Sequence, residues 1–126
     1  MIMDYDPQNI FARILRGEIP CKKIYETKHV LAFHDIAPQA KIHALVIPKG
    51  AYVSLADFSA KASAEEIAEL IRAVGEVAKI LGVAESGYRC LSNCGNHAHQ
   101  EVPHLHFHIF GGEKLGRMIQ PERQLH

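Results

Sequence analysis

The sequence has no excess of either charge. Fourteen basic and fourteen acidic side chains give a formal net charge of zero when histidine is neutral. A protein that binds nucleic acid or a membrane surface through its overall charge normally carries a basic excess. We therefore expect no nucleic-acid partner and no membrane partner. A small local anion site is still compatible with this overall neutrality.

The sequence also lacks export, membrane and cross-linking signals. No apolar stretch approaches the length of a membrane span. The first ten residues, MIMDYDPQNI, lack the basic start and long apolar run of a secretory signal. The three cysteines are an odd number, so we expect no disulfide framework. These absences favour a cytoplasmic protein.

No internal repeat, low-complexity tract or linker divides the 126 residues. This length suits one domain with a substantial core. We predict a single domain over residues 1–126, with a core of about residues 8–112 and a C-terminal tail over 113–126.

The apolar pattern predicts two helices and five strands. Helical spacing predicts a short helix over 10–15 and a long one that starts after Ser63 and ends at Gly82. Ser63 and Glu66 have the spacing of a capping box, and Gly82 suits the C-terminal cap. The predicted strands lie in KKIYET, VLAFHDI, IHALVIP, GYRCLSN and HLHFHIF.

Two of the connections between these strands are short enough for hairpins, which favours antiparallel pairing. We predict an α+β fold in which one long and one short helix pack on one face of a five-stranded antiparallel sheet. In the last strand Leu105, Phe107 and Ile109 would face the long helix, because side chains alternate between the faces of a strand. The histidines between them would then lie on the open face.

His104, His106 and His108 form the most unusual pattern in the sequence. Without any function, three exposed histidines in strict alternation would be a coincidence. A zinc site is a second interpretation, but His104 and His108 are about 13–14 Å apart along a strand. The three histidines therefore cannot all bind one ion. A zinc site would need two of the three and a further ligand, such as His43, His97 or His99.

Nucleophilic catalysis is the third interpretation and the one we favour. A neutral imidazole is a good nucleophile toward phosphorus, and an ordinary pKa of about 6.5 leaves histidine mostly unprotonated at neutral pH. His106 would attack, while its neighbours would fix its tautomer and bind phosphate oxygens. We expect no metal and no cofactor.

The motif HLHFHIF resembles the signature of the histidine triad (HIT) family, in which three histidines alternate with apolar residues. Blocks along the chain look like those of the histidine triad nucleotide-binding branch, in the same order and with similar spacing. They are NIFARILRGEIPCKKIYE, VLAFHDIAPQAKIHALVIPKG, GYRCLSN and VPHLHFHIFGG. With the helix between them, they cover nearly the whole chain.

The resemblance implies a HIT-like fold and a homodimer whose two sheets join edge to edge. It implies hydrolysis of purine nucleoside phosphoramidates, typically adenosine monophosphate linked to an amine, through a nucleotidyl-histidine intermediate. Two alternatives stay open. The protein would instead be a nucleotide-binding partner protein with incidental hydrolysis, or a dinucleoside polyphosphate hydrolase of the same family.

The resemblance also implies roles for individual residues. His106 matches the nucleophile, His108 contacts the phosphate, and His104 and His43 support them. Asp35 matches the carboxylate that holds the ribose hydroxyls. The base would lie between walls formed by Ile10, Phe11, Phe33, His34 and Ile36. The polar residues near the phosphate, ribose and leaving group would be Asn93, Gln100 and Glu101.

The chain departs from the family pattern at three places. Many relatives carry a Cys-x-x-Cys zinc pair where this chain has Asn9 and Ala12. Glu101 replaces a small hydroxyl residue of the animal members, and the tail KLGRMIQPERQLH lacks their Trp-Pro-Pro ending. We expect His97 and His99 to be exposed to solvent, and His126 to lie in a disordered end.

Overall fold

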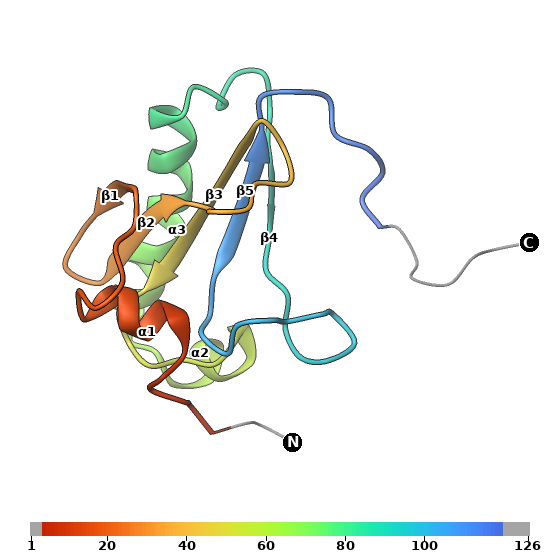
Figure 1. Cartoon of the computed structure of the whole chain (residues 1–126). Coiled ribbons are helices and arrows are strands. Elements are labelled where there is room, and N and C mark those ends of the chain that lie inside the picture. Colours follow the sequence, from red (N-terminus) through yellow and green to blue (C-terminus); the bar gives the residue numbers. More distant parts are fainter. Residues whose placement is uncertain (1–3, 120–126) are drawn as a thin grey trace, which may run out of the picture.

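A computed structural model describes residues 4–119 of the chain. The elements occur in the order α1 (Ile10–Leu15), β1 (Lys23–Glu26), β2 (Val30–His34), β3 (Ile42–Pro48), α2 (Leu55–Lys61), α3 (Ala64–Ile80), β4 (Arg89–Leu91) and β5 (Phe107–Gly111) (Figure 1). Within the described residues, no helix is both long and apolar enough to cross a membrane.

The strands form one antiparallel sheet in the order β1-β2-β3-β5-β4. This confirms the predicted α+β fold with five antiparallel strands. A tight turn joins β1 to β2, with the Thr27 amide donating to the Val30 carbonyl at 2.9 Å. β3 lies at the centre of the sheet and pairs with both β2 and β5.

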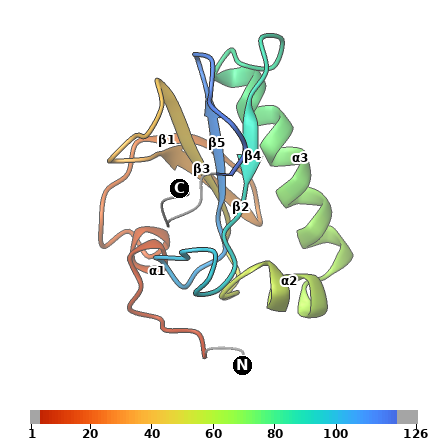
Figure 2. The ribbon, with the colours of Figure 1, turned by 90° about the vertical axis from the view of Figure 1, so that its right-hand side faces the viewer.

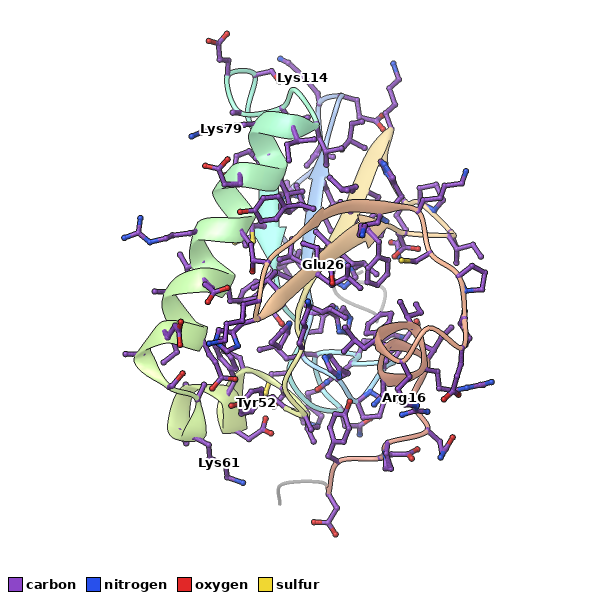
Figure 3. All side chains as sticks on the ribbon, turned by 90° about the vertical axis from the view of Figure 1, so that its left-hand side faces the viewer. Arg16, Glu26, Tyr52, Lys61, Lys79 and Lys114 are labelled. Atoms are coloured by element: carbon purple, nitrogen blue, oxygen red, sulfur yellow. The ribbon has the colours of Figure 1, made fainter. Side chains whose placement is uncertain are left out.

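The long helix α3 covers one face of the sheet, as predicted. Ser63 and Glu66 form its capping box, and Gly82 follows with a positive φ of 73°. Its buried stripe packs against Ala44 and Val46 of β3, Ile109 of β5, and Leu105 just before β5. Figure 3 shows the side chains that fill this layer, with Lys79 pointing outward from the helix.

The prediction that both helices pack on one face was wrong, because α1 covers the opposite face (Figure 2). Phe11 of α1 packs there against Leu31, Phe33, Leu45 and Ile47. The central strand β3 is apolar on both faces, and a strand of this kind needs cover on each side. This second layer also covers the face that carries the histidines.

A second short helix, α2, was not predicted. Its seven residues follow Ser54, and Ser54 and Asp57 form a capping box at its start. The spacing of Ser54 and Asp57 is a helix-start signal in the sequence, but the apolar pattern that follows is too short to identify a helix by periodicity.

The last strand is shorter than predicted. β5 begins at Phe107, so His104 and His106 precede it. Ladder pairing between β3 and β5 stops at Val46 and Phe107. The chain then bonds to the segment after β3 instead, through a 2.8 Å hydrogen bond from the Leu105 amide to the Tyr52 carbonyl.

The predicted tail is described only in part. Residues 113–119 follow β5 without a helix or strand. The rest of the predicted tail, including His126, lies outside the described residues.

Candidate active site

Four histidines gather on the face of the sheet that α1 covers. The pairing of β3 with β5 places Leu45 opposite His108 and His43 opposite Phe110. His43 and His108 are therefore diagonal neighbours on one face, with ring centroids 5.2 Å apart. The ring of His106 follows at 5.0 Å from that of His108.

The two preceding histidines are less accessible than the sequence predicted. Instead of lying on an open face, His104 is fully buried and His106 is 6% exposed. Phe11 covers both rings, with its centroid 5.0 Å from that of His106 and 6.2 Å from that of His104. The prediction of an open face was wrong, because we expected α1 to pack on the other side of the sheet.

The protonation of the His104 ring follows from its two partners. Its Nε2 lies 2.8 Å from the carbonyl oxygen of Pro48, which only accepts, so Nε2 carries the proton. Burial lowers the pKa of His104 to about 4, so the ring is neutral at pH 7. Nδ1 therefore accepts from the hydroxyl of Tyr5, at 2.6 Å.

The same reasoning fixes the tautomer of His106. Its Nδ1 lies 2.7 Å from the carbonyl oxygen of His104, so Nδ1 carries a proton and donates it. Burial lowers the pKa of His106, which favours the neutral ring at pH 7. Its Nε2 is left with a lone pair, as a nucleophile requires.

His43 and His108 form a second hydrogen-bonded chain. The backbone amide of Gln39 donates to Nδ1 of His43 at 3.1 Å, so a neutral His43 carries its proton on Nε2. That Nε2 donates to Nδ1 of His108 at 2.9 Å. A neutral His108 then carries its own proton on Nε2. His106 and His108 therefore present opposite groups, a lone pair on one ring and an N–H on the other.

Burial is the main cause of low basicity in the whole cluster. Desolvation lowers the pKa of His43 and takes the pKa of His108 to about 4. The negative charge of Asp35 opposes this and raises the pKa of both. Because desolvation is the larger effect, the cluster is uncharged at pH 7, and a nucleophilic ring is not lost to protonation.

Asp35 lies beside the cluster at the end of β2. Its Oδ1 accepts from the Ala37 amide at 2.8 Å, in a local turn. Its Oδ2 lies 3.4 Å from Nε2 of His43, and 18% of the side chain is exposed. One carboxylate oxygen is thus held by the turn, while the other faces the histidines and solvent.

The five residues that were predicted to surround the nucleotide base fall into a buried and an exposed group. Phe11 and Phe33 are buried with their ring centroids 5.7 Å apart, and Phe11 contacts His106. Ile10 and Ile36 are exposed at 45% and 97%. His34 is also exposed, and the alternation of β2 directs it to the face of α3. The two phenylalanines therefore lie together beside His106.

The side chain of Gln100 stabilises the loop that precedes His104, His106 and His108. Its Oε1 accepts from the Gly95 amide at 2.9 Å, and its Nε2 donates to the carbonyl oxygens of Val53 and Val102 at 2.6 and 3.0 Å. All of these partners are backbone groups. In this structure its amide is therefore engaged in holding the loop.

The other loop residues lie nearer to solvent. Glu101 is exposed, with a carboxylate oxygen 3.7 Å from Nε2 of His99, and its charge raises the pKa of His106 against the effect of burial. Asn93 is half-buried, two residues after β4. His97 and His99 are both exposed, which confirms that prediction.

Two side chains that donate hydrogen bonds to the histidine segment were missed in the sequence. Ser92 donates to the carbonyl oxygen of His106 at 2.7 Å, and Tyr5 donates to His104. The position of Ser92 within the predicted strand GYRCLSN was a usable signal, because that strand was expected in the same sheet as His104, His106 and His108. Tyr5 lies before every predicted element, and no pattern connected it to a residue 99 positions away.

Two groups in the described part of the chain have ligand atoms close enough to hold a metal ion. One is Asp35, His43 and His108, within the histidine cluster, and the other is His29, Glu65 and Glu69. A metal in the first group would have to replace the bond between His43 and His108.

The zinc pair of many relatives does not fit this chain. Asn9 caps α1, with its Oδ1 accepting from the Ala12 amide at 2.9 Å. The amide and the methyl group at these two positions are not zinc ligands.

Comparison with known proteins agrees with this geometry. The HIT domain family model matches residues 16–115. An uncharacterized HIT-like protein of Azospirillum brasilense is 69% identical over 119 residues, which cover 94% of this chain and 98% of that relative. The purine nucleoside phosphoramidase of Escherichia coli K12 is 39% identical over 112 residues, covering 89% of this chain and 93% of the enzyme.

A solved structure has the same fold. The HIT family hydrolase from Clostridium thermocellum superposes with a TM-score of 0.83 and 37% identity, over 90% of this chain and 97% of that one. The family model and these relatives each span most of the chain. The chain therefore belongs to the HIT domain family.

Proposed function

We propose that this protein is a hydrolase that cleaves the P–N bond of purine nucleoside phosphoramidates, such as adenosine monophosphate linked to an amine. The observation that carries the proposal is the set of hydrogen-bond partners around His106 and His108, from which their tautomers follow. One ring offers a lone pair for attack on phosphorus, and its neighbour offers an N–H to a phosphate oxygen. The similarity to the phosphoramidase of Escherichia coli supports this substrate class.

The proposed reaction has two displacements at phosphorus. Nε2 of His106 attacks, a bond from nitrogen to phosphorus forms, and the bond to the amine breaks. The amine keeps the electron pair and takes a proton from solvent. Water then attacks the nucleotidyl-histidine and breaks the new P–N bond, which releases the nucleoside monophosphate and a proton and restores the neutral ring.

Other residues bind the substrate in this proposal. The Oδ2 of Asp35 accepts from the ribose hydroxyls, and the Nε2–H of His108 donates to a phosphate oxygen. Phe11 and Phe33 support the base through their edge-to-face pair. Glu101 is exposed beside the loop and suits a cationic amine better than an anionic one.

We also propose a homodimer. β1 and β4 are the two edges of the sheet, and an edge strand carries unpaired backbone groups that a second copy would satisfy. Sedimentation at micromolar concentration should give the mass of two chains, whereas the mass of one chain would contradict the dimer.

The substrate class is tested by steady-state kinetics with adenosine phosphoramidate and a dinucleoside polyphosphate in parallel. The proposal predicts a larger kcat/KM for the phosphoramidate. Faster cleavage of the polyphosphate would reject this substrate class. Tight nucleotide binding with negligible turnover of both would indicate a binding protein.

A further inference from the structure

Tyr5 joins the N-terminal segment to the first histidine of the triad. Its hydroxyl lies 2.6 Å from Nδ1 of His104, although 99 positions separate the two residues. The two rings meet edge to face, with centroids 5.5 Å apart. A hydrogen bond this short between distant segments fixes the position of both side chains.

The direction of this hydrogen bond is settled by the other nitrogen of His104. That nitrogen donates to the Pro48 carbonyl oxygen, so the neutral ring has its only lone pair on Nδ1. The Tyr5 hydroxyl is therefore the donor. Because both nitrogens are occupied, the side chain of His104 has no free group for the chemistry, and its place in the site must be explained by what it holds.

His104 holds the nucleophile through its backbone. Its carbonyl oxygen accepts the 2.7 Å hydrogen bond from Nδ1 of His106, and this bond fixes both the ring orientation and the tautomer of His106. Because the side chain of His104 is anchored by Tyr5 and Pro48, the peptide that follows it is anchored as well.

The segment around Tyr5 reaches His106 by a second route. The Asp6 carbonyl oxygen accepts from both the backbone and the side-chain amide of Asn9, at 3.1 and 2.7 Å, directly before α1. The second residue of that helix is Phe11, whose ring packs edge to face on His106. One short segment thus contacts the nucleophile directly and supports it through His104.

We propose that Tyr5 is a positioning residue that holds the nucleophile His106 in its reactive orientation by donating to His104. This role rests on the proposed function, because it assumes attack by Nε2 of His106. Tyr5 itself does not touch the reacting atoms. Its removal should therefore slow the chemical step and leave nucleotide binding nearly unchanged.

The test compares Tyr5→Phe with a matched control, Tyr52→Phe. Both variants lose one tyrosine hydroxyl hydrogen bond, since Tyr52 donates to the Glu66 carboxylate at 2.9 Å on the α3 side of the sheet. For Tyr5→Phe we expect kcat to fall about threefold to tenfold with KM nearly constant, as one lost hydrogen bond of this kind would give. The Tyr52→Phe variant should keep the wild-type kcat at temperatures where both variants are folded.

Nitrogen NMR of the histidine rings gives a readout that does not depend on catalysis. In Tyr5→Phe the Nδ1 resonance of His104 should move toward that of an unbonded imidazole nitrogen, and the His106 resonances should shift or broaden. In Tyr52→Phe both sets should stay at their wild-type positions.

The outcomes separate this inference from the proposed function. An unchanged kcat in Tyr5→Phe, an equal loss in both variants, or a raised KM alone would overturn the positioning role. If wild-type protein does not hydrolyse phosphoramidates, the proposed function fails, and the His106 resonances still decide the inference. Unchanged His106 resonances in Tyr5→Phe would then reject it.

Discussion

The carbonyl oxygen of His104 accepts a 2.7 Å hydrogen bond from Nδ1 of His106. This single contact puts the proton of the His106 ring on its inner nitrogen and leaves a lone pair on the outer one. Burial favours the same state, because it lowers the pKa of His106 and keeps the ring uncharged. We expect this arrangement to determine the pH dependence of kcat/KM and the histidine that forms the covalent intermediate.

The pH dependence of kcat/KM should report the lowered pKa of His106. Only the unprotonated ring attacks. In the free enzyme the pKa of His106 lies below the ordinary value of about 6.5. We therefore expect kcat/KM to decline in acid with its half-maximal value below pH 6.5. Rates from pH 4.5 to 8 with a substrate that does not titrate in this range would test this. A half-maximal rate above pH 6.5 would contradict a buried, neutral nucleophile.

Stability should fall in acid because His104 is buried in the neutral form. Its pKa is about 4 in the folded protein and about 6.5 in the unfolded chain. Between these values the unfolded chain binds more protons, so the free energy of unfolding falls as the pH drops from 6.5 to 4, by up to about 1.4 kcal/mol per pH unit for this one group. Above pH 6.5 this group has no effect on the slope.

Denaturant unfolding at several pH values would measure this slope. His104→Gln should be less stable than wild type at pH 7 but should lose less stability between pH 6.5 and 4. His97→Gln, at an exposed loop position, is the control and should keep the wild-type slope. Equal slopes in all three proteins would exclude His104 as the source.

Asp35→Asn should weaken nucleotide binding more than it slows the chemical step. The substitution removes a charged acceptor for the ribose hydroxyls, worth about 1.5–3 kcal/mol, and leaves the bonds of His106 in place. We expect KM to rise roughly tenfold to a hundredfold with kcat changed by less than threefold. Because Asp35 also lies 3.4 Å from His43, the experiment distinguishes two roles. A large fall in kcat at constant KM would show that Asp35 acts on the histidine chain and not on ribose.

Removal of metal ions should leave the activity unchanged. The proposed attack needs no ion, and the positions of the usual cysteine pair hold Asn9 and Ala12. Added zinc should inhibit instead, by binding Asp35, His43 and His108 and breaking the 2.9 Å bond between the two histidines. Dialysis against a chelator followed by zinc titration tests both statements. Activity that is lost with the chelator and regained with zinc would reverse this interpretation.

The fold was largely predictable because its signals are local. The capping box at Ser63 and Glu66, the apolar stripe of α3 and the alternation in β3 each predict their own element. The side of the sheet on which α1 packs was not predictable in this way. That side is set by Leu45 and Ile47, which need an apolar cover and pack with Phe11 of α1. No local pattern specifies how the chain between α1 and β1 turns to bring about this contact.

The triad was predictable from spacing, but its partners were not. Two of the atoms that set the tautomers are the Pro48 carbonyl oxygen and the Gln39 amide, which are backbone groups and carry no sequence signal. The hydroxyl of Tyr5 is a side-chain group, but nothing in one sequence links it to a residue 99 positions away. Such contacts arise only when the chain is folded.

His106→Ala should abolish turnover while nucleotide binding remains within a few-fold of wild type. The substitution removes the nucleophile, whereas the proposed ribose contact lies on Asp35 and the proposed phosphate contact on His108. Turnover and the Kd for adenosine monophosphate, measured by calorimetry, would test this together. Wild-type turnover in His106→Ala would exclude His106 as the nucleophile.

The most direct measurement is the location of the covalent intermediate. Labelled adenosine phosphoramidate is mixed with the enzyme, the reaction is quenched rapidly without acid, and peptides spanning residues 102–110 are examined by mass spectrometry. The lone pair on Nε2 of His106 predicts a nucleotidyl adduct on His106, which is absent in His106→Ala. An adduct on His104 or His108 would contradict the assignment of the nucleophile.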